Sequence, residues 1–566
     1  MFDDETRIDS TGEYSASSKW KSEASSPALL WSETRLEVWF PFSTTQAMHE
    51  IITLQFGQQA NYIGTHYWNT QESYFTYAGQ EESPVNHDIS FRAGIGANGD
   101  DTYTPRTLIY DLKGAFGTLR RENALYELQH EEQPSQRGVW SGATVPLRLS
   151  SIAPSGYQQA LDQGINPPRL ATDTVRFWSD YNHLFYHPRS IVQLNEYELS
   201  STLMPFEQWS SGEELFVSLD REHDLLDRDL RPFLEECDQL QGLQVLTGID
   251  DAWGGFAAKY LERVSDDLGK GCRWVFGLQD GKRVSRQRQM LQIANVAQSL
   301  LAINGSASMH LPMTSLPTPL PAYVSLDAES KWHTSALQAA VMESITLPTR
   351  LRRHEAGRAS FDMLETTLSN EGNRRVAATG LTVTENKDGA AEGVQSNGHH
   401  DTRMTNGHTN GAEDSAEDEA PKLDIDFFPN PDITVTGLRT VGRRTHTFSS
   451  VSTLRGQPAP ADDTASIEAA YRDRMGEGPR TATYRSQLLF PALSSYPPIF
   501  RLAETAFGIK ASVSTTTAVA DRIRGIEGIA RRSMGMVERE SLCDGLVTMA
   551  EEYEEGWSDD EDYGEE

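Results

Sequence analysis

Strand-like and helix-like segments alternate along residues 48–350, and no other feature of the sequence restricts the fold as strongly. Short apolar runs with β-branched residues predict buried strands at HEIITLQF (49–56), TLIYDL (107–112), LQVLTGI (243–249) and CRWVFGL (272–278). Apolar residues at helical spacing predict helices at 58–69, 228–241, 256–271, 286–302 and 333–345. Strands and helices in this order form the crossover units of a parallel sheet. We therefore predict an α/β fold with a parallel-sheet core of the nucleotide-binding type.

Composition divides the chain further. Residues 1–47 are rich in Ser, Thr and Glu, and residues 376–421 contain almost no large apolar side chains, so neither segment can offset its ordering entropy by burial. A smaller second α+β region is expected after the second of these segments. The predicted parts are a disordered extension (1–47), the first segment of the folded body (48–165), its continuation (166–375), a disordered linker (376–421), a C-terminal region (422–550) and an acidic tail (551–566).

The charge excludes several classes of function. The 50 Lys and Arg residues against 82 Asp and Glu residues give a net charge of −32, and residues 551–566 hold ten of the acids. Proteins that bind nucleic acid or anionic membranes directly need a basic surface, so we expect neither activity. The acidic tail is expected either to increase solubility or to bind basic partner proteins.

Cysteine and histidine usage predicts no metal site. Three cysteines, Cys237, Cys272 and Cys543, are too few and too scattered for a disulfide framework or a four-cysteine zinc site, which favours a reducing compartment. His399, His400 and His408 lie in the predicted linker and are interpreted as solvated. The sequence has neither a membrane-spanning apolar segment nor a recognisable leader, so membrane association is expected to be peripheral at most.

Two glycine-containing turns are candidates for phosphate binding. The run GIGANG (94–99) matches G-x-G-x-x-G, but it continues into DDTYTP, which cannot begin a helix, so we interpret it as a surface loop. The turn at Gly57 is more informative, because a predicted strand ends there and Gln58 and Asn61 lie in the first turn of the following helix. Backbone amides at such a turn suit an anion or a nucleotide, although a strand-to-helix turn often has only a structural role.

The segment around this turn resembles a known family. MHEIITLQFGQQANYIGTHYW (48–68) is similar to the N-terminus of tubulins, and YTPRTLIYDLKG (103–114) and ECDQLQGLQVL (236–246) are similar to later tubulin segments in the same order. The forms NTQESYFTY (69–77) and DAWGGFA (251–257) resemble those of the Misato family, fungal Dml type. The resemblance implies a tubulin-like fold, with 48–165 as the Misato-type N-terminal segment and 166–375 as the continuation of the tubulin-like domain.

The resemblance also implies a cellular role. Misato-family proteins act in the partitioning and distribution of mitochondria and in the inheritance of mitochondrial DNA. A location in the cytoplasm and at the mitochondrion, on its outer surface, would follow, with protein partners such as a chaperonin, tubulin or mitochondrial surface factors. Two alternatives remain at this point: a GTP-binding tubulin-like GTPase that polymerises, and a chaperonin-linked tubulin assembly factor.

The departure from tubulins lies in the phosphate loop. Where tubulins have G-G-G-T-G-S-G, this chain has DDAWGGF (250–256), so two carboxylates and a tryptophan replace the glycine-rich loop. Each carboxylate about 4 Å from a phosphate costs about 1 kcal/mol in water and several at lower dielectric. An N-x-D-x-x-E segment, with which a neighbouring tubulin subunit completes GTP hydrolysis, is not recognisable either. We therefore expect no GTPase activity, no catalytic residues and no bound cofactor.

A weak nucleotide site is the alternative to this expectation. Its contacts would be Gln58, Asn61, Gly254 and Gly255, and a Mg²⁺ ion that bridges Asp250 or Asp251 to phosphate could offset the repulsion.

Overall fold

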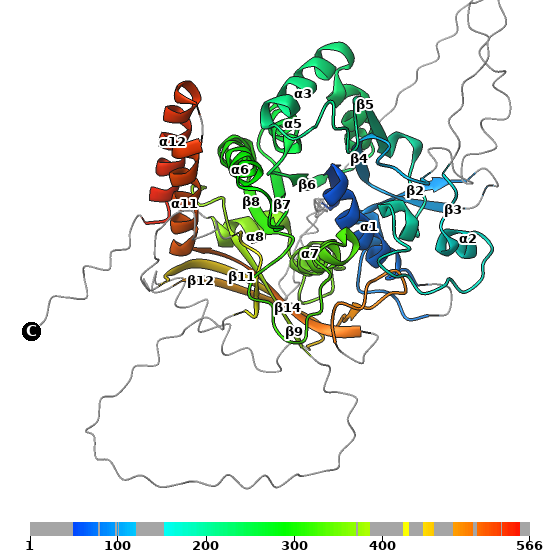
Figure 1. Cartoon of the computed structure of the whole chain (residues 1–566). Helices are drawn as coiled ribbons and strands as arrows, with labels where there is room; N and C mark the ends of the chain where they lie inside the picture. The colour runs from blue at the N-terminus through cyan, green and yellow to red at the C-terminus, as the bar shows by residue number, and fades with distance from the viewer. Residues whose placement is uncertain are drawn as a thin grey trace, which may run out of the picture. The chain divides into compact units, whose positions relative to one another are not determined.

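The structure is a computed structural model of the whole chain (Figure 1). All described residues fall within one compact unit, Ala47–Glu566. The described residues are 49–76, 80–96, 99, 101–119, 152–369, 372–384, 423–429, 445–457, 479–501, 506–533 and 535–554.

A six-stranded parallel sheet forms the first half of the fold. Its strand order is β5-β4-β1-β6-β7-β8, and all five pairings are parallel. The parallel-sheet core predicted from the sequence is therefore confirmed, and strands β1, β4, β6 and β7 lie where the apolar runs placed them. The strands are β1 (Glu50–Phe56), β4 (Thr107–Lys113), β5 (Ile191–Glu198), β6 (Leu240–Gly248), β7 (Cys272–Gln279) and β8 (Met309–Thr314).

Helices cover both faces of this sheet, as Figure 1 shows. In β1, Ile51 packs in one apolar cluster, whereas Ile52, Leu54 and Phe56 pack in the other, so the strand is buried on both sides. One face carries α1 (Gln58–Glu72) and α7 (Lys331–Thr346), and the other carries α3 (Trp209–His223), α5 (Ala252–Leu268) and α6 (Arg286–Ser306).

Shorter elements connect these layers. A hairpin of β2 (Phe91–Ile95) and β3 (Asp101–Pro105), buried at one end and exposed at the other, follows α1, and α2 (Gly156–Asp162) precedes β5. The remaining short elements are α4 (Arg231–Glu235), α8 (Phe361–Leu368), the 3-10 turns His87–Ile89, Trp178–Tyr181, Pro188–Ser190 and Leu347–Arg350, and the π turn Leu226–Leu230.

The second half of the fold is a mixed sheet with the order β10-β9-β14-β11-β12. This half of the fold contains the smaller α+β region that the sequence predicted. Its first long strand meets the parallel sheet at a bridge between His310 of β8 and Val376. The elements are β9 (Ala378–Thr384), β10 (Ile425–Asp426), β11 (Thr447–Arg455), β12 (Arg480–Ser486), β13 (Phe490–Pro491), β14 (Ala506–Thr516), α11 (Thr517–Ser533) and α12 (Met536–Glu551).

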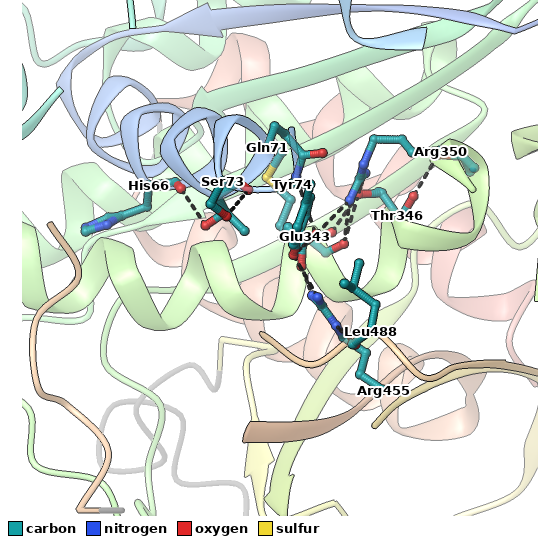
Figure 2. Close-up of polar contacts among 12 residues, drawn as sticks. His66, Gln71, Ser73, Tyr74, Glu343, Thr346, Arg350, Arg455 and Leu488 are labelled. Carbon is teal, nitrogen blue, oxygen red and sulfur yellow. Dashed lines mark hydrogen bonds and ion pairs between the residues drawn. The ribbon is translucent and has the colours of Figure 1, made fainter. Parts of the chain in front are cut away.

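Helix α7 lies between the two sheets and is buried along almost its whole length. At its centre Glu343 accepts hydrogen bonds from Tyr74 Oη at 3.1 Å and from Arg350 Nη2 at 3.1 Å. From the second sheet, Arg455 pairs with the other oxygen of the same carboxylate (Figure 2). This network joins α1, α7 and β11, which come from three distant parts of the sequence.

Three boundaries predicted from the sequence were wrong. The helix predicted at 228–241 is a π turn followed by α4, which ends at Glu235, and β6 begins at Leu240. The predicted start of the linker at 376 is wrong, because Ala378–Thr384 form β9, with Leu381 fully buried. The rest of that linker, the three histidines in it and residues 1–47 lie outside the described residues.

The third wrong boundary is the start of the acidic tail. The tail was predicted from 551, but Tyr553 is fully buried and its hydroxyl bonds both the N–H and the C=O of Val376, at 2.7 Å each. Glu554 accepts from Arg524 Nη2 at 2.6 Å. Residues 551–554 thus belong to the folded body, and 555–566 lie outside the described residues.

Candidate functional site

A cavity of about 290 Å³ lies at the carboxyl ends of β1, β4, β6 and β7. This edge of a parallel sheet is where open α/β folds bind their ligands. Residues 198–201 and 205–207, between β5 and α3, line one side of the cavity. The N-terminal ends of α6 and α7 contribute Arg288 and Lys331.

The first turn of α1 contributes one of the two predicted contacts. Gly57 has φ +88°, which lets β1 turn directly into the helix. Gln58 lines the cavity, and its Oε1 accepts from Lys331 Nζ at 2.9 Å. Asn61 is buried behind this turn, where its Nδ2 donates to Asp111 Oδ2 at 2.7 Å, and it is not part of the lining.

The turn after β6 is closed by the chain's own side chains. Asp251 caps α5, because its Oδ1 accepts the backbone N–H of Trp253 at 2.9 Å. The Trp253 indole packs against Gly57, where an added Cβ would lie 2.5 Å from the indole Nε1. A carboxylate and an indole thus fill the first turn of α5, where a glycine-rich loop would leave amides free for an anion.

Gly254 and Gly255 serve helix packing in this structure. An added Cβ at Gly254 would overlap Ser299 Oγ of α6, and one at Gly255 would overlap the backbone oxygen of Trp209 of α3. Both glycines are buried, and neither lines the cavity. Of the four predicted contacts, the structure therefore brings only Gln58 to the cavity wall.

Negative charge dominates the lining. Arg288 is paired with Glu207 at 3.0 Å, and Lys282 is paired at 3.0 Å with Glu329, which is outside the lining. Lys331 then remains as the lining cation that is not in an ion pair with a described carboxylate. The lining contains six carboxylates, Asp111, Glu198, Glu207, Asp250, Asp251 and Asp280, against three cations, Lys282, Arg288 and Lys331.

Burial and mutual repulsion perturb these groups. Burial raises the pKa of Asp111, whose side chain is fully buried, to about 7. Desolvation, and for Asp250 also the neighbouring Asp251 carboxylate, raises the pKa values of Asp250 and Asp251 above the usual range. Desolvation lowers the pKa of Lys331, against the attraction of Asp111 and Asp251. The cavity lining therefore has more carboxylate groups than cationic side chains to pair with them.

These residues do not fit the phosphates of a nucleotide. The anion-binding end of α5 is occupied by Asp251, Trp253 blocks the approach to Gly57, and the surrounding charge is negative. Among the described residues, no group of three or more His, Cys, Asp or Glu side chains has the arrangement of a metal site. Across the same residues, no helix is both long and apolar enough to cross a membrane.

The sequence indicated this site only in part. Asp111 was not predicted as a site residue, although it lies one residue before the end of the predicted strand TLIYDL, near the edge at which parallel sheets bind ligands. Lys331 carries no local signal, because it reaches the cavity only through the packing of α7 against α1. The GIGANG run is not part of the site, and Gly94 lies in the exposed hairpin strand β2.

Two models of known protein families match this chain. A family model described as a Misato Segment II tubulin-like domain matches residues 49–163, and one described as a tubulin domain matches residues 167–351.

Several fungal proteins are similar to this chain, two of them along about nine tenths of its length. Protein DML1 of Phaeosphaeria nodorum is 45% identical over 524 residues, which cover 90% of this chain and 98% of that protein. Protein dml-1 of Neurospora crassa is 45% identical over 542 residues, with 91% and 99% covered. Protein dml1 of Schizosaccharomyces pombe is 33% identical over 346 residues, with 57% and 70% covered.

Proposed function

Because the chain belongs to the Misato family of tubulin-like proteins, in its fungal Dml branch, we propose that it is a non-catalytic protein that acts in the distribution of mitochondria and in the inheritance of mitochondrial DNA. The observation that carries the non-catalytic part is the turn after β6, where Asp251 and Trp253 fill the place of the phosphate loop within an otherwise complete parallel sheet. The mitochondrial part rests on the family resemblance of the sequence.

In this proposal the protein works through protein partners. It would act in the cytoplasm and on the outer surface of mitochondria, without direct contact to nucleic acid and with peripheral membrane association at most. A net charge of −32 supports binding to basic partner surfaces rather than to phosphate-rich ones. A chaperonin, tubulin and mitochondrial surface factors are the partner classes that the resemblance suggests.

The non-catalytic part is tested by the nucleotide content of the purified full chain. The protein is denatured, and the supernatant is analysed by anion-exchange chromatography beside purified tubulin, which serves as the positive control. We expect no stoichiometric GTP or GDP and no GTP hydrolysis after addition of GTP and Mg²⁺. Stoichiometric nucleotide would favour the polymerising GTPase instead.

The mitochondrial part is tested by replacement in a fungus. In Neurospora crassa the relative dml-1 is placed under a repressible promoter, and this chain is expressed in its place. We expect repression alone to disturb mitochondrial distribution and mitochondrial DNA retention, and this chain to restore both. Loss of microtubules before any mitochondrial change would favour the tubulin assembly factor, and undisturbed mitochondria after full repression would refute the proposal.

A further inference from the structure

We infer that the cavity at the carboxyl edge of the parallel sheet is a docking site for a basic side chain, an arginine or lysine flanked by apolar residues, on a partner protein. The inference builds on the proposed function, since it takes the cavity to be free of nucleotide.

Unneutralised carboxylates supply the charge for such a ligand. Asp250, Asp251, Asp111 and Asp280 line the cavity, and no described carboxylate is in an ion pair with Lys331, whose Nζ donates instead to Gln58. Burial raises the pKa values of Asp111, Asp250 and Asp251, and the neighbouring Asp251 carboxylate raises that of Asp250 further. A guanidinium or ammonium group would supply a positive charge to pair with these carboxylates.

Aromatic walls are a second, independent feature of the cavity. Phe206 and Trp253 both line it, and their rings meet edge to face with centroids 5.2 Å apart. The face of an aromatic ring, and of an indole above all, attracts a cation through its quadrupole. Carboxylates and aromatic rings on the same cavity favour an organic cation over a small hydrated metal ion.

The residues beside the cavity opening, Leu203 and Met204, suit a cation that is a side chain of a partner protein. Leu203 and Met204 lie between the lining residues Ser201 and Pro205, and their side chains are 92% and 55% exposed. In this inference the two exposed apolar side chains are the contact surface for a protein segment. They would cover the apolar neighbours of the inserted basic residue, a contact that a free polyamine could not make.

Binding is measured by isothermal titration calorimetry of the full chain at pH 8. The probe is the peptide acetyl-Gly-Leu-Arg-Leu-Gly-amide, and its matched control has citrulline, which has nearly the same shape without the charge, in place of arginine. We expect the arginine peptide to bind at least about tenfold more tightly than the citrulline peptide. The reason is that the free energy of a charge pair at about 4 Å in a partly buried site exceeds the free energy that corresponds to a tenfold change in affinity.

Substitutions that preserve the local hydrogen bonds locate the site. In the double variant Asp250→Asn and Asp251→Asn, the amide oxygens still accept from Asp280 and Trp253, and asparagine also caps helices well. We expect about tenfold weaker binding in that variant and weaker binding in Leu203→Ser, because charge pairing and rim contact are lost separately. Asp266→Asn, an exposed carboxylate of α5 outside the cavity, is the control and is expected to change nothing.

The outcomes separate this inference from the proposed function. No binding of the arginine peptide, equal affinity for the citrulline peptide, or spermidine binding that equals the peptide and ignores Leu203→Ser would each overturn the docking site. GTP titrated into the same protein tests the proposed function. Binding and hydrolysis of GTP would refute the non-catalytic proposal and remove the premise of the docking site, whereas failure of both peptide and GTP to bind would refute only the docking site.

Discussion

Arg455 of β11 and Glu343 of α7 form an ion pair in which both side chains are completely buried. Arg350 pairs with the same carboxylate from the 3-10 turn that follows α7, and Tyr74 donates to it from the residues after α1. The central helix is thus attached to the second sheet by charge as well as by apolar packing.

Removal of this carboxylate should destabilise the protein strongly. Glu343→Gln leaves Arg350 and Arg455 as buried cations without a counter-charge, which costs about 3–5 kcal/mol of unfolding free energy in comparable cases. Urea unfolding followed by circular dichroism measures the change. Glu329→Gln, which removes an exposed pair with Lys282, is the control and should cost less than about 1 kcal/mol. Equal effects of the two substitutions would contradict the prediction.

The two glycines of α5 should respond differently to alanine. Gly254→Ala places a Cβ against the Ser299 hydroxyl, and Gly255→Ala places one against the backbone oxygen of Trp209. Overpacking of this kind costs about 1–3 kcal/mol. In thermal unfolding, Ser299→Ala should recover part of the loss for Gly254→Ala and none of it for Gly255→Ala. Recovery in both cases would mean that the helix contacts are more adaptable than the structure implies.

Asp111 should make stability depend on pH. Its folded-state pKa of about 7 lies above the ordinary value of 3.8, so the folded chain binds more protons between these values and the free energy of unfolding falls as pH rises through this range. Besides Asn61 and the Leu112 N–H, the groups facing it are the cation Lys331 and the carboxylate Asp251. Asp111→Asn removes this titration, and Asn61 Oδ1, which has no hydrogen-bond partner among the described residues, can turn to accept from the new amide.

We therefore expect Asp111→Asn to stabilise the protein by roughly 1–3 kcal/mol at pH 8, since each unit of pKa shift represents about 1.4 kcal/mol. The gain should disappear near pH 4. Urea unfolding at pH 5, 6, 7 and 8 measures the slope, with Asp266→Asn as the exposed control. A variant whose stability keeps the full slope of the native chain would assign the pH dependence to other groups.

The C-terminal end of the folded body should lie at Glu554. A chain that ends there keeps the Tyr553 bonds to Val376 and the Arg524 pair, so its melting temperature should match that of the full chain. Tyr553→Phe leaves the buried N–H and C=O of Val376 without this partner and should cost about 1–3 kcal/mol. Thermal unfolding followed by calorimetry compares the three proteins. A large loss on removal of 555–566 alone would contradict the assignment.

The sequence predicted four of the six strands of the parallel sheet, because β1, β4, β6 and β7 contain short apolar runs, which are typical of strands buried on both faces. The sequence did not predict β9, because the small and polar residues of ATGLTVT resemble those of a linker. They form a strand through pairing with β14, which lies far away in sequence. Tyr553 was missed for a similar reason, since it lies among acidic residues and is buried only by contact with Val376.

The candidate site was predicted less completely than the fold. Gln58 was predicted as a nucleotide contact from the turn that contains it, and in the structure it lines the cavity. Gly254 and Gly255 resemble a phosphate loop in sequence, but which side of a helix faces a ligand depends on the neighbouring helices α3 and α6. Lys331 joins the site from more than 200 residues away in sequence, a distance over which local patterns carry no information.

The order of the second sheet has a consequence for synthesis of the chain. The middle strand of this sheet, β14, is the last of the described strands to leave the ribosome. Strands β9 and β11 are made earlier, and in the described sheet each of them pairs with β14 on one side and with an outer strand on the other. Until Ala506–Thr516 emerges, both strands present an open edge, with Leu381 and Val451 still to be buried. Open edges of this kind invite pairing between chains. The nascent protein, more than the finished one, is therefore the form that needs protection from self-association.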